Sequence, residues 1–514
     1  MITSTPANER PQPTRESLPA SSPLRRAADS AALTLAAVAA SFLTVAALCR
    51  WRGLDEQPAI LAALMAISLS RRRKAGRDAH PLRHALAIGC VAPAAALVGR
   101  LLQLQPVLGA FAFTAAIALS VYLRDFGARG RVAGALIALP LIAMIVVPPP
   151  AVAPGGSFAQ LAITLIAGLI ALAYATAIRT LSGAWHGAAA ATPLPPPVPV
   201  AERRARGGLT ATARLALQMA VAVGAAFGLG FIAFPAHWGW LVFTAFIVCS
   251  GARGRGDALC KGVMRLGGAA AGTLAAAVLL RVPHPGGFLG GCAIFAVLYA
   301  GLALREVSYA YWAGAMTLIL ALLAAPANSL TPAVLGLRLE AILAGALCAV
   351  GAAWFVFPIR TEAVIRRRLA DALSALDEFV SHAHTDPQQS ERLAILEHRL
   401  AELDSVAMPA EWHRRLFAAR ADANHPARWI RTAREVGGHA RRFGAGGVPH
   451  DTQRARIRRA IGLTRRAVAN HAAPGKNAAS APPAEALAIG AALDGICHAF
   501  SAAGAPAAAP RRDA

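Results

Sequence analysis

The sequence has few charged side chains for its length. Asp, Glu, Lys and Arg make up 15% of its 514 residues, whereas soluble domains usually carry about 25%. The deficit is concentrated between residues 31 and 358, where the chain is almost continuously apolar and charges occupy short gaps. Apolar runs approaching ~20 residues are typical of helices that cross a bilayer. The composition therefore predicts an integral membrane protein rather than a soluble domain.

The sequence also lacks the short motifs of common catalytic and metal sites. It contains no Walker A sequence, no H-E-x-x-H and no G-x-S-x-G, so we expect neither an ATP-driven pump acting alone nor an enzyme. None of the seven cysteines forms a C-x-x-C pair. We therefore predict no metal site, no cofactor and no disulfide framework.

Acidic residues are scarcer than basic ones, 27 against 51, which gives a net charge of +24. In a soluble protein this balance would indicate nucleic acid as a partner. Here the apolar runs make the arginines topology signals instead, because basic loops stay on the cytoplasmic side of a membrane. Most of the loop arginines fall on one side if the N-terminus is inside, so we predict that both termini are cytoplasmic.

Two sets of six apolar segments are the predicted spans, separated by a Pro/Arg-rich cytoplasmic linker over residues 181–211. Similar sequence features recur roughly 180 residues apart, among them Leu123-Arg124-Asp125 and Leu304-Arg305-Glu306. Because each block has an even number of spans, both blocks would have the same orientation in the membrane. The predicted fold class is an all-α integral membrane protein of about twelve transmembrane helices in two parallel six-helix repeats. The spans of the first block (31–180) are 31–49, 58–70, 84–104, 106–123, 132–147 and 157–180, and those of the second (212–358) are 212–234, 238–250, 266–280, 287–304, 312–325 and 337–357.

The two ends of the chain are polar. Residues 1–30 are Pro-rich and predict a disordered cytoplasmic tail. Residues 359–514 predict a basic helical cytoplasmic domain, because apolar residues such as Ile365, Leu369 and Leu373 recur at helical spacing. The Ala/Pro-rich composition from Ala472 onward predicts that this domain has a disordered end.

The segment from Arg214 to Leu280 carries the most specific pattern. An Arg-led apolar helix is followed by Pro235, by a short segment with two tryptophans and a threonine, by a basic loop, and by the sequence Arg265-Leu-Gly-Gly268-Ala-Ala-Ala-Gly272-Thr. This pattern resembles the fusaric acid resistance (FUSC) family and the related aromatic acid exporters, as does the final apolar segment that ends at Pro358. Ala269 stands where the family usually has Thr, and only a linker stands where many longer members have a cytoplasmic domain.

The resemblance implies secondary-active efflux of small aromatic or hydrophobic organic acids across the bacterial inner membrane, which we expect to be proton-coupled. It also implies a periplasmic adaptor and an outer-membrane channel as partners, since some members use them. A homo-oligomer in the lipid bilayer fits this expectation, and nucleic acid does not. A channel-like anion pathway and a non-transporting membrane scaffold are the alternatives.

The spans after Pro58 and Pro235 are unusually short, and short segments at matching places in two halves indicate a transport site. Glu306 or Glu340 could carry the proton, because a proton-coupled exporter needs a titratable group in the membrane. Arg338 could attract an anion or reach toward lipid phosphate. The two Arg-acid sequences are either local ion pairs or gating elements. The candidate residues for substrate binding or coupling are Arg124, Asp125, Trp238, Trp240, Thr244, Arg265, Arg305, Glu306, Arg338 and Glu340.

Overall fold

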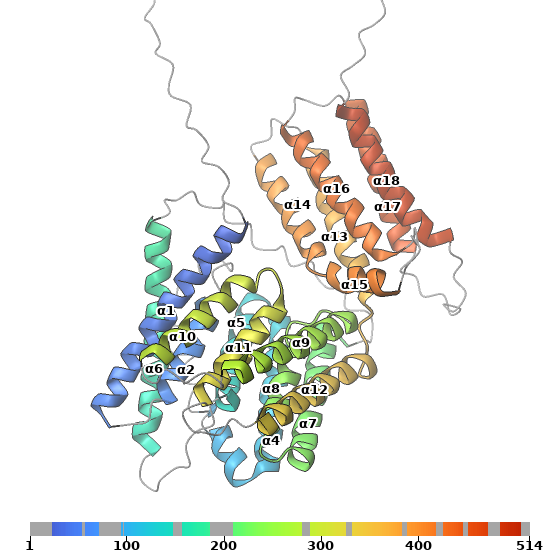
Figure 1. Ribbon diagram of the computed structural model, residues 1–514. Helices are drawn as coiled ribbons and strands as arrows, with labels where there is room; N and C mark the ends of the chain where they lie inside the picture. The colour runs from blue at the N-terminus through green and yellow to red at the C-terminus, as the bar shows by residue number, and fades with distance from the viewer. Residues whose placement is uncertain are drawn as a thin grey trace, which may run out of the picture.

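The computed structural model is helical throughout the part of the chain that it describes (Figure 1). Helices of the two apolar blocks form one bundle, and six more helices form a separate bundle beside it. The described residues are 23–53, 57–70, 94–95, 97–146, 157–185, 209–279, 288–324, 332–382, 388–417, 425–445, 451–470 and 484–504.

The apolar blocks contain most of the predicted spans as helices. Five helices are long and apolar enough to cross a membrane, namely α1, α4 with the turn that follows it, α7, α9 and α12, and six others are apolar but shorter. The first block comprises α1 (Pro23–Trp51), α2 (Gln57–Ser70), α4 (Pro106–Tyr122), η2 (Leu123–Phe126), α5 (Gly127–Val146) and α6 (Ser157–Trp185), and the second α7 (Ala211–Ala233), α8 (Trp238–Cys249), α9 (Arg255–Leu279), α10 (Phe288–Leu304), α11 (Tyr309–Ala324) and α12 (Pro332–Phe355). The protein is therefore a multi-pass membrane protein.

The same helix contacts recur in both blocks. Helices α1, α2 and α6 contact one another in the first block, as α7, α8 and α12 do in the second. Between the blocks, α4 packs against α7 and α1 packs against α10. The rings of Phe113 and Phe227, whose centroids lie 5.5 Å apart, are at the centre of the α4–α7 contact.

The start of α9 differs from the sequence-based prediction. The basic loop was expected to continue through Arg265, but α9 already begins at Arg255, so Lys261 and Arg265 are helical. Asp257 in the first turn accepts a hydrogen bond from the backbone N–H of Arg253 at 3.1 Å, and this contact stabilises a helix start ahead of the apolar stretch. The position of an apolar run alone cannot locate such a start.

The arrangement of α9 on α11 depends on glycine. A Cβ atom at Gly268 would collide with the backbone oxygen of Ala310, and one at Gly272 would collide with the backbone oxygen of Gly314. Small residues allow the backbones of neighbouring membrane helices to approach closely. The glycines of the segment that begins at Arg265 therefore set the distance between α9 and α11.

The described residues between 361 and 504 form the second bundle, which comprises α13 (Thr361–Ser381), α14 (Gln389–Asp404), α15 (Ala407–Phe417), α16 (Pro426–Ala445), α17 (Asp451–Asn470) and α18 (Ala484–Gly504). The predicted disordered end does not hold for residues 484–504, which form α18. Ile489, Leu493 and Ile496 are fully buried in the core of this bundle, at the spacing of one helix face. Similarly, α1 begins at Pro23, inside the predicted N-terminal tail.

Candidate anion-binding site

The site is built on α8, the short helix that follows Pro235. Residues 234–237 interrupt the helical path between α7 and α8, and α8 has only 12 residues. The indole of Trp238 packs against Phe227 and Phe231, with ring centroids 5.5 and 5.7 Å away, and so fixes the start of α8 on α7. The prediction of short helices after Pro58 and Pro235 is confirmed, since α2 has 14 residues.

Arg338 of α12 lies buried against α8. Its side chain is 4% exposed, and its guanidinium carbon lies 3.7 Å from the centroid of the Trp240 ring. This stacking is a cation–π contact, which gains strength when water is excluded. Nη2 donates a long hydrogen bond of 3.5 Å to the backbone oxygen of Thr317 on α11, whereas Nε has no hydrogen-bond partner among the described residues.

Arg265 of α9 lies against the next ring on the same face of α8. It is 1% exposed, and its guanidinium carbon is 5.5 Å from the centroid of the Phe243 ring. Trp240 and Phe243 are three residues apart and therefore neighbours on the helix surface, and their ring centroids are 6.5 Å apart. Helix α8 thus presents two adjacent aromatic rings, each in contact with one buried arginine.

The two arginines have no acidic counterpart within the part of the chain that the structure describes. Their ion pairs would appear among the described salt bridges, and none involves Arg265 or Arg338. Nε and Nη2 of Arg265 also have no hydrogen-bond partner there. Burying a charge without a partner is costly, and arginine keeps its charge in proteins. The site is therefore a buried positive region with free N–H donors, which suits an anion.

Thr244 adds a polar group to the same helix. It is fully buried, and its hydroxyl likewise makes no hydrogen bond with any described residue. A hydroxyl can donate one hydrogen bond and accept two. Thr244 lies four residues after Trp240 on α8 and is therefore its neighbour on the helix surface, so it can supply another donor near the arginines.

The other candidate residues are not brought to this site. Arg305 and Glu306 form an exposed ion pair at 3.4 Å, the kind of contact that contributes little to stability. Asp125 accepts a hydrogen bond of 2.7 Å from the hydroxyl of Thr210, while Arg124 lies beside it in η2. Glu340 is exposed on the outer face of α12, although Arg338 is buried. Positions two apart on a helix point in nearly opposite directions.

Two residues of the site were missed by the sequence analysis. Phe243 lies within the quoted pattern, and its spacing of three residues from Trp240 would have identified it. Thr317 contributes a backbone oxygen, for which the sequence carries no signal. Arg265 was named as a candidate but interpreted as a loop residue.

Comparison with known proteins finds a similarity over the second block. Residues 210–352 match the family model described as fusaric acid resistance protein-like. The matched range contains α7 to α11 and most of α12, with both arginines and the two aromatic rings. The predicted resemblance is confirmed over these residues. No curated protein and no solved structure matches the chain.

Proposed function

Because residues 210–352 match the fusaric acid resistance protein-like family, we propose that the protein exports small aromatic or hydrophobic organic acids across the bacterial inner membrane. The observation that carries this proposal is the pair of buried arginines, each in contact with an aromatic ring of α8 and neither paired with an acid among the described residues. A carboxylate can accept two parallel hydrogen bonds from a guanidinium. An aromatic ring on the substrate can pack beside Trp240 or Phe243.

The order of the arginines along the membrane supports a path with two steps. Arg265 lies ten residues after the start of α9, or ~15 Å along the helix, and Arg338 lies six residues after the start of α12, or ~9 Å. With both termini in the cytoplasm, α9 begins at the inner surface and α12 at the outer one. An exported anion would therefore meet Arg265 first and Arg338 second.

The two-repeat architecture and the topology belong to the same proposal. The reciprocal packing of α4 against α7 and of α1 against α10 supports two parallel blocks of six spans, related by an axis along the membrane normal. A periplasmic adaptor, an outer-membrane channel and a second copy of the chain are the proposed partners. Fusaric acid resistance-like proteins are membrane transport proteins, so we propose no catalytic activity.

The proposal is tested by the charge of the transported molecule. Purified protein in proteoliposomes should move benzoate but not benzamide, which has the same shape without the negative charge. The arginines would interact with the benzoate anion far more strongly than with a neutral amide. The uptake of each radiolabelled compound, measured at neutral pH, tests this difference between benzoate and benzamide. Equal transport of the two compounds, or transport of neither, would contradict the proposed function.

Coupling to protons is tested at Glu340. Glu340→Gln should abolish transport of benzoate driven by a pH gradient and leave membrane abundance unchanged, if this carboxyl carries the proton. The matched control is Glu397→Gln, because Glu397 forms an exposed ion pair with Arg441 in the second bundle, away from the site. A channel-like anion pathway is the alternative, and the absence of acidic partners from the described surroundings of the arginines favours it. Full pH-driven transport by Glu340→Gln would exclude Glu340 from coupling and strengthen that alternative.

A further inference from the structure

The cytoplasmic end of α9 is held by residues far away in the sequence. The first N–H groups of any helix need acceptors outside it. In α9, the backbone N–H of Arg255 donates to the carbonyl of Ile359 at 3.1 Å, and that of Gly256 donates to Oγ1 of Thr361 at 3.1 Å. Ile359 lies in the short connection that follows α12, and Thr361 is the first residue of α13. The helices that carry Arg265 and Arg338 are therefore joined at one end.

The second bundle adds another contact to the same end of α9. Nη1 of Arg253 donates to the backbone oxygen of Ser405 at 2.8 Å. Ser405 lies in the turn between α14 and α15. Arg253 precedes α9 by two residues, and its own backbone N–H is fixed by Asp257. The α14–α15 turn thus holds the loop that leads into α9.

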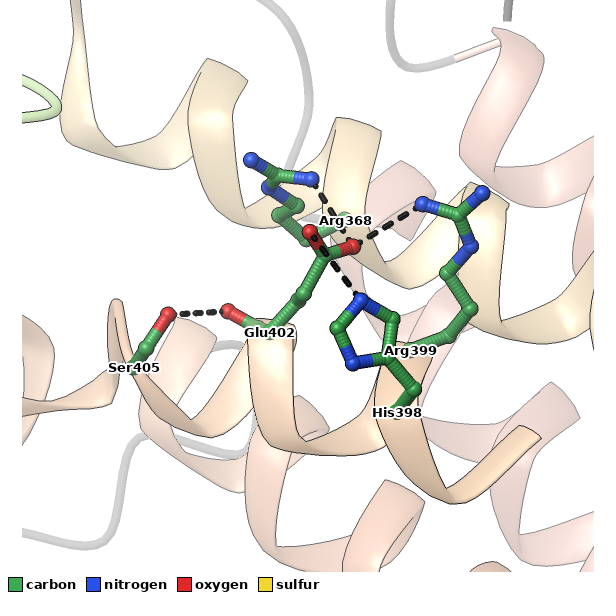
Figure 2. A network of polar contacts seen from close by, with 5 residues as sticks. All are labelled: Arg368, His398, Arg399, Glu402 and Ser405. Atoms are coloured by element: carbon green, nitrogen blue, oxygen red, sulfur yellow. Dashed lines mark hydrogen bonds and ion pairs between the residues drawn. The ribbon is translucent and has the colours of Figure 1, made fainter. Parts of the chain in front are cut away.

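A polar network fixes this turn within the second bundle (Figure 2). The carboxylate of Glu402 accepts hydrogen bonds of 3.0 Å from Arg368 on α13 and from Arg399 on α14, and the hydroxyl of Ser405 donates to the backbone oxygen of Glu402. Each of these partly exposed contacts contributes little by itself. Together they orient the carbonyl of Ser405 relative to α13, which begins at Thr361.

The contact between α9 and the second bundle is close. A Cβ atom at Gly256 would lie 2.7 Å from Oγ1 of Thr361 and 3.0 Å from Cβ of Pro409 on α15, so a larger residue there would force these side chains to move. Helix α8 is tied to the same region, because Nζ of Lys261 on α9 donates to the backbone oxygen of Ser250 at 3.2 Å. Helices α8, α9 and α12, which carry the two aromatic rings and the two arginines, are thus connected at the end that faces the second bundle.

We propose that Thr361 and Arg253 are positioning residues of the anion site. Through them, the second bundle fixes the position of α9 relative to α12 and thereby sets the separation of Arg265 from Arg338. The effect on transport rests on the proposed function, whereas the attachment of α9 to the second bundle does not. A binding group that is displaced by about 1 Å loses much of its contribution to affinity. Loss of the contacts that hold α9 should therefore weaken the binding of the anion.

Substitution of Thr361 tests the proposal in the full-length protein. Thr361→Val keeps the shape of the side chain and removes the acceptor, whereas Thr361→Ser keeps the acceptor. The matched control is Thr464→Val, because the hydroxyl of Thr464 donates to the backbone oxygen of Ala460 on its own helix and to no other described residue. We expect Thr361→Val to speed hydrogen exchange in residues 255–265 about fivefold, the size expected for one lost hydrogen bond.

The same variants are compared in benzoate transport by proteoliposomes. Thr361→Val should raise KM about fivefold with little change in kcat, while Thr361→Ser and Thr464→Val stay within about twofold of the wild type. Unchanged exchange in Thr361→Val, or faster exchange with an unchanged KM, would overturn the positioning role. If the wild type transports no benzoate but exchange still responds to Thr361→Val, the proposed function fails and the attachment of α9 stands.

Discussion

Arg265→Gln should weaken benzoate binding by about 10- to 100-fold, because hydrogen bonds to a charged group contribute roughly 1.5–3 kcal/mol. The same substitution should leave the protein without ligand as stable as the wild type or more stable. The side chain is 1% exposed and has no acidic partner among the described residues, so glutamine removes an uncompensated buried charge. Loss of function with a gain in stability is the mark of a binding residue.

Thermal unfolding in the presence and absence of benzoate checks this prediction. A ligand that binds only the folded protein raises the midpoint of unfolding, so benzoate should stabilise the wild type and not Arg265→Gln. Arg305→Gln is the matched control, because Arg305 forms an exposed ion pair outside the site. A destabilised Arg265→Gln that still responds to benzoate would assign Arg265 a structural role.

Gly272→Val should have the largest effect on folding. The added side chain would meet the backbone oxygen of Gly314 and, at 3.0 Å, Cβ of Thr317. Backbone atoms cannot move aside as a flexible side chain can, so α9 and α11 must separate, and overpacking of this kind costs about 3 kcal/mol or more. We expect a severalfold loss of folded protein in the membrane.

Gly267→Val provides the matched control on the same helix. A Cβ atom at Gly267 meets nothing within 4 Å, so this variant should reach the wild-type amount. Membrane abundance and the elution profile in detergent report the outcome. Equal abundance of Gly267→Val and Gly272→Val would contradict the close packing of α9 on α11.

Much of the helical architecture could be predicted from the positions and lengths of the apolar runs. The short α8 after Pro235 was predicted because proline interrupts a helix and few apolar residues follow. The start of α9 was not, because its first turns carry Arg255, Asp257 and Lys261 and therefore read as a loop. Helix α18 was not predicted either, because the Ala/Pro-rich composition of this region concealed the helical spacing of Ile489, Leu493 and Ile496.

Most residues of the site could be predicted from the sequence, but which of them contact one another could not. Arg338 and Trp240 were both candidates, but they are about one hundred residues apart, and their contact depends on the packing of α12 against α8. A Cβ atom at Gly345 would collide with the backbone oxygen of Leu241, so this glycine brings the two helices together. Such an approach is a property of three-dimensional packing, which one sequence does not reveal.

The central claim is that Arg265 and Arg338 bind the carboxylate of an aromatic acid beside the rings of α8. The most direct test is an electron cryomicroscopy map of the full-length protein with 4-iodobenzoate, whose iodine identifies the orientation of the ligand. The predicted result is a carboxylate within hydrogen-bond distance of at least one of the two guanidinium groups, with the ring beside Trp240 or Phe243. A map in which acidic side chains of the protein pair with both arginines, and the ligand lies elsewhere, would contradict the claim.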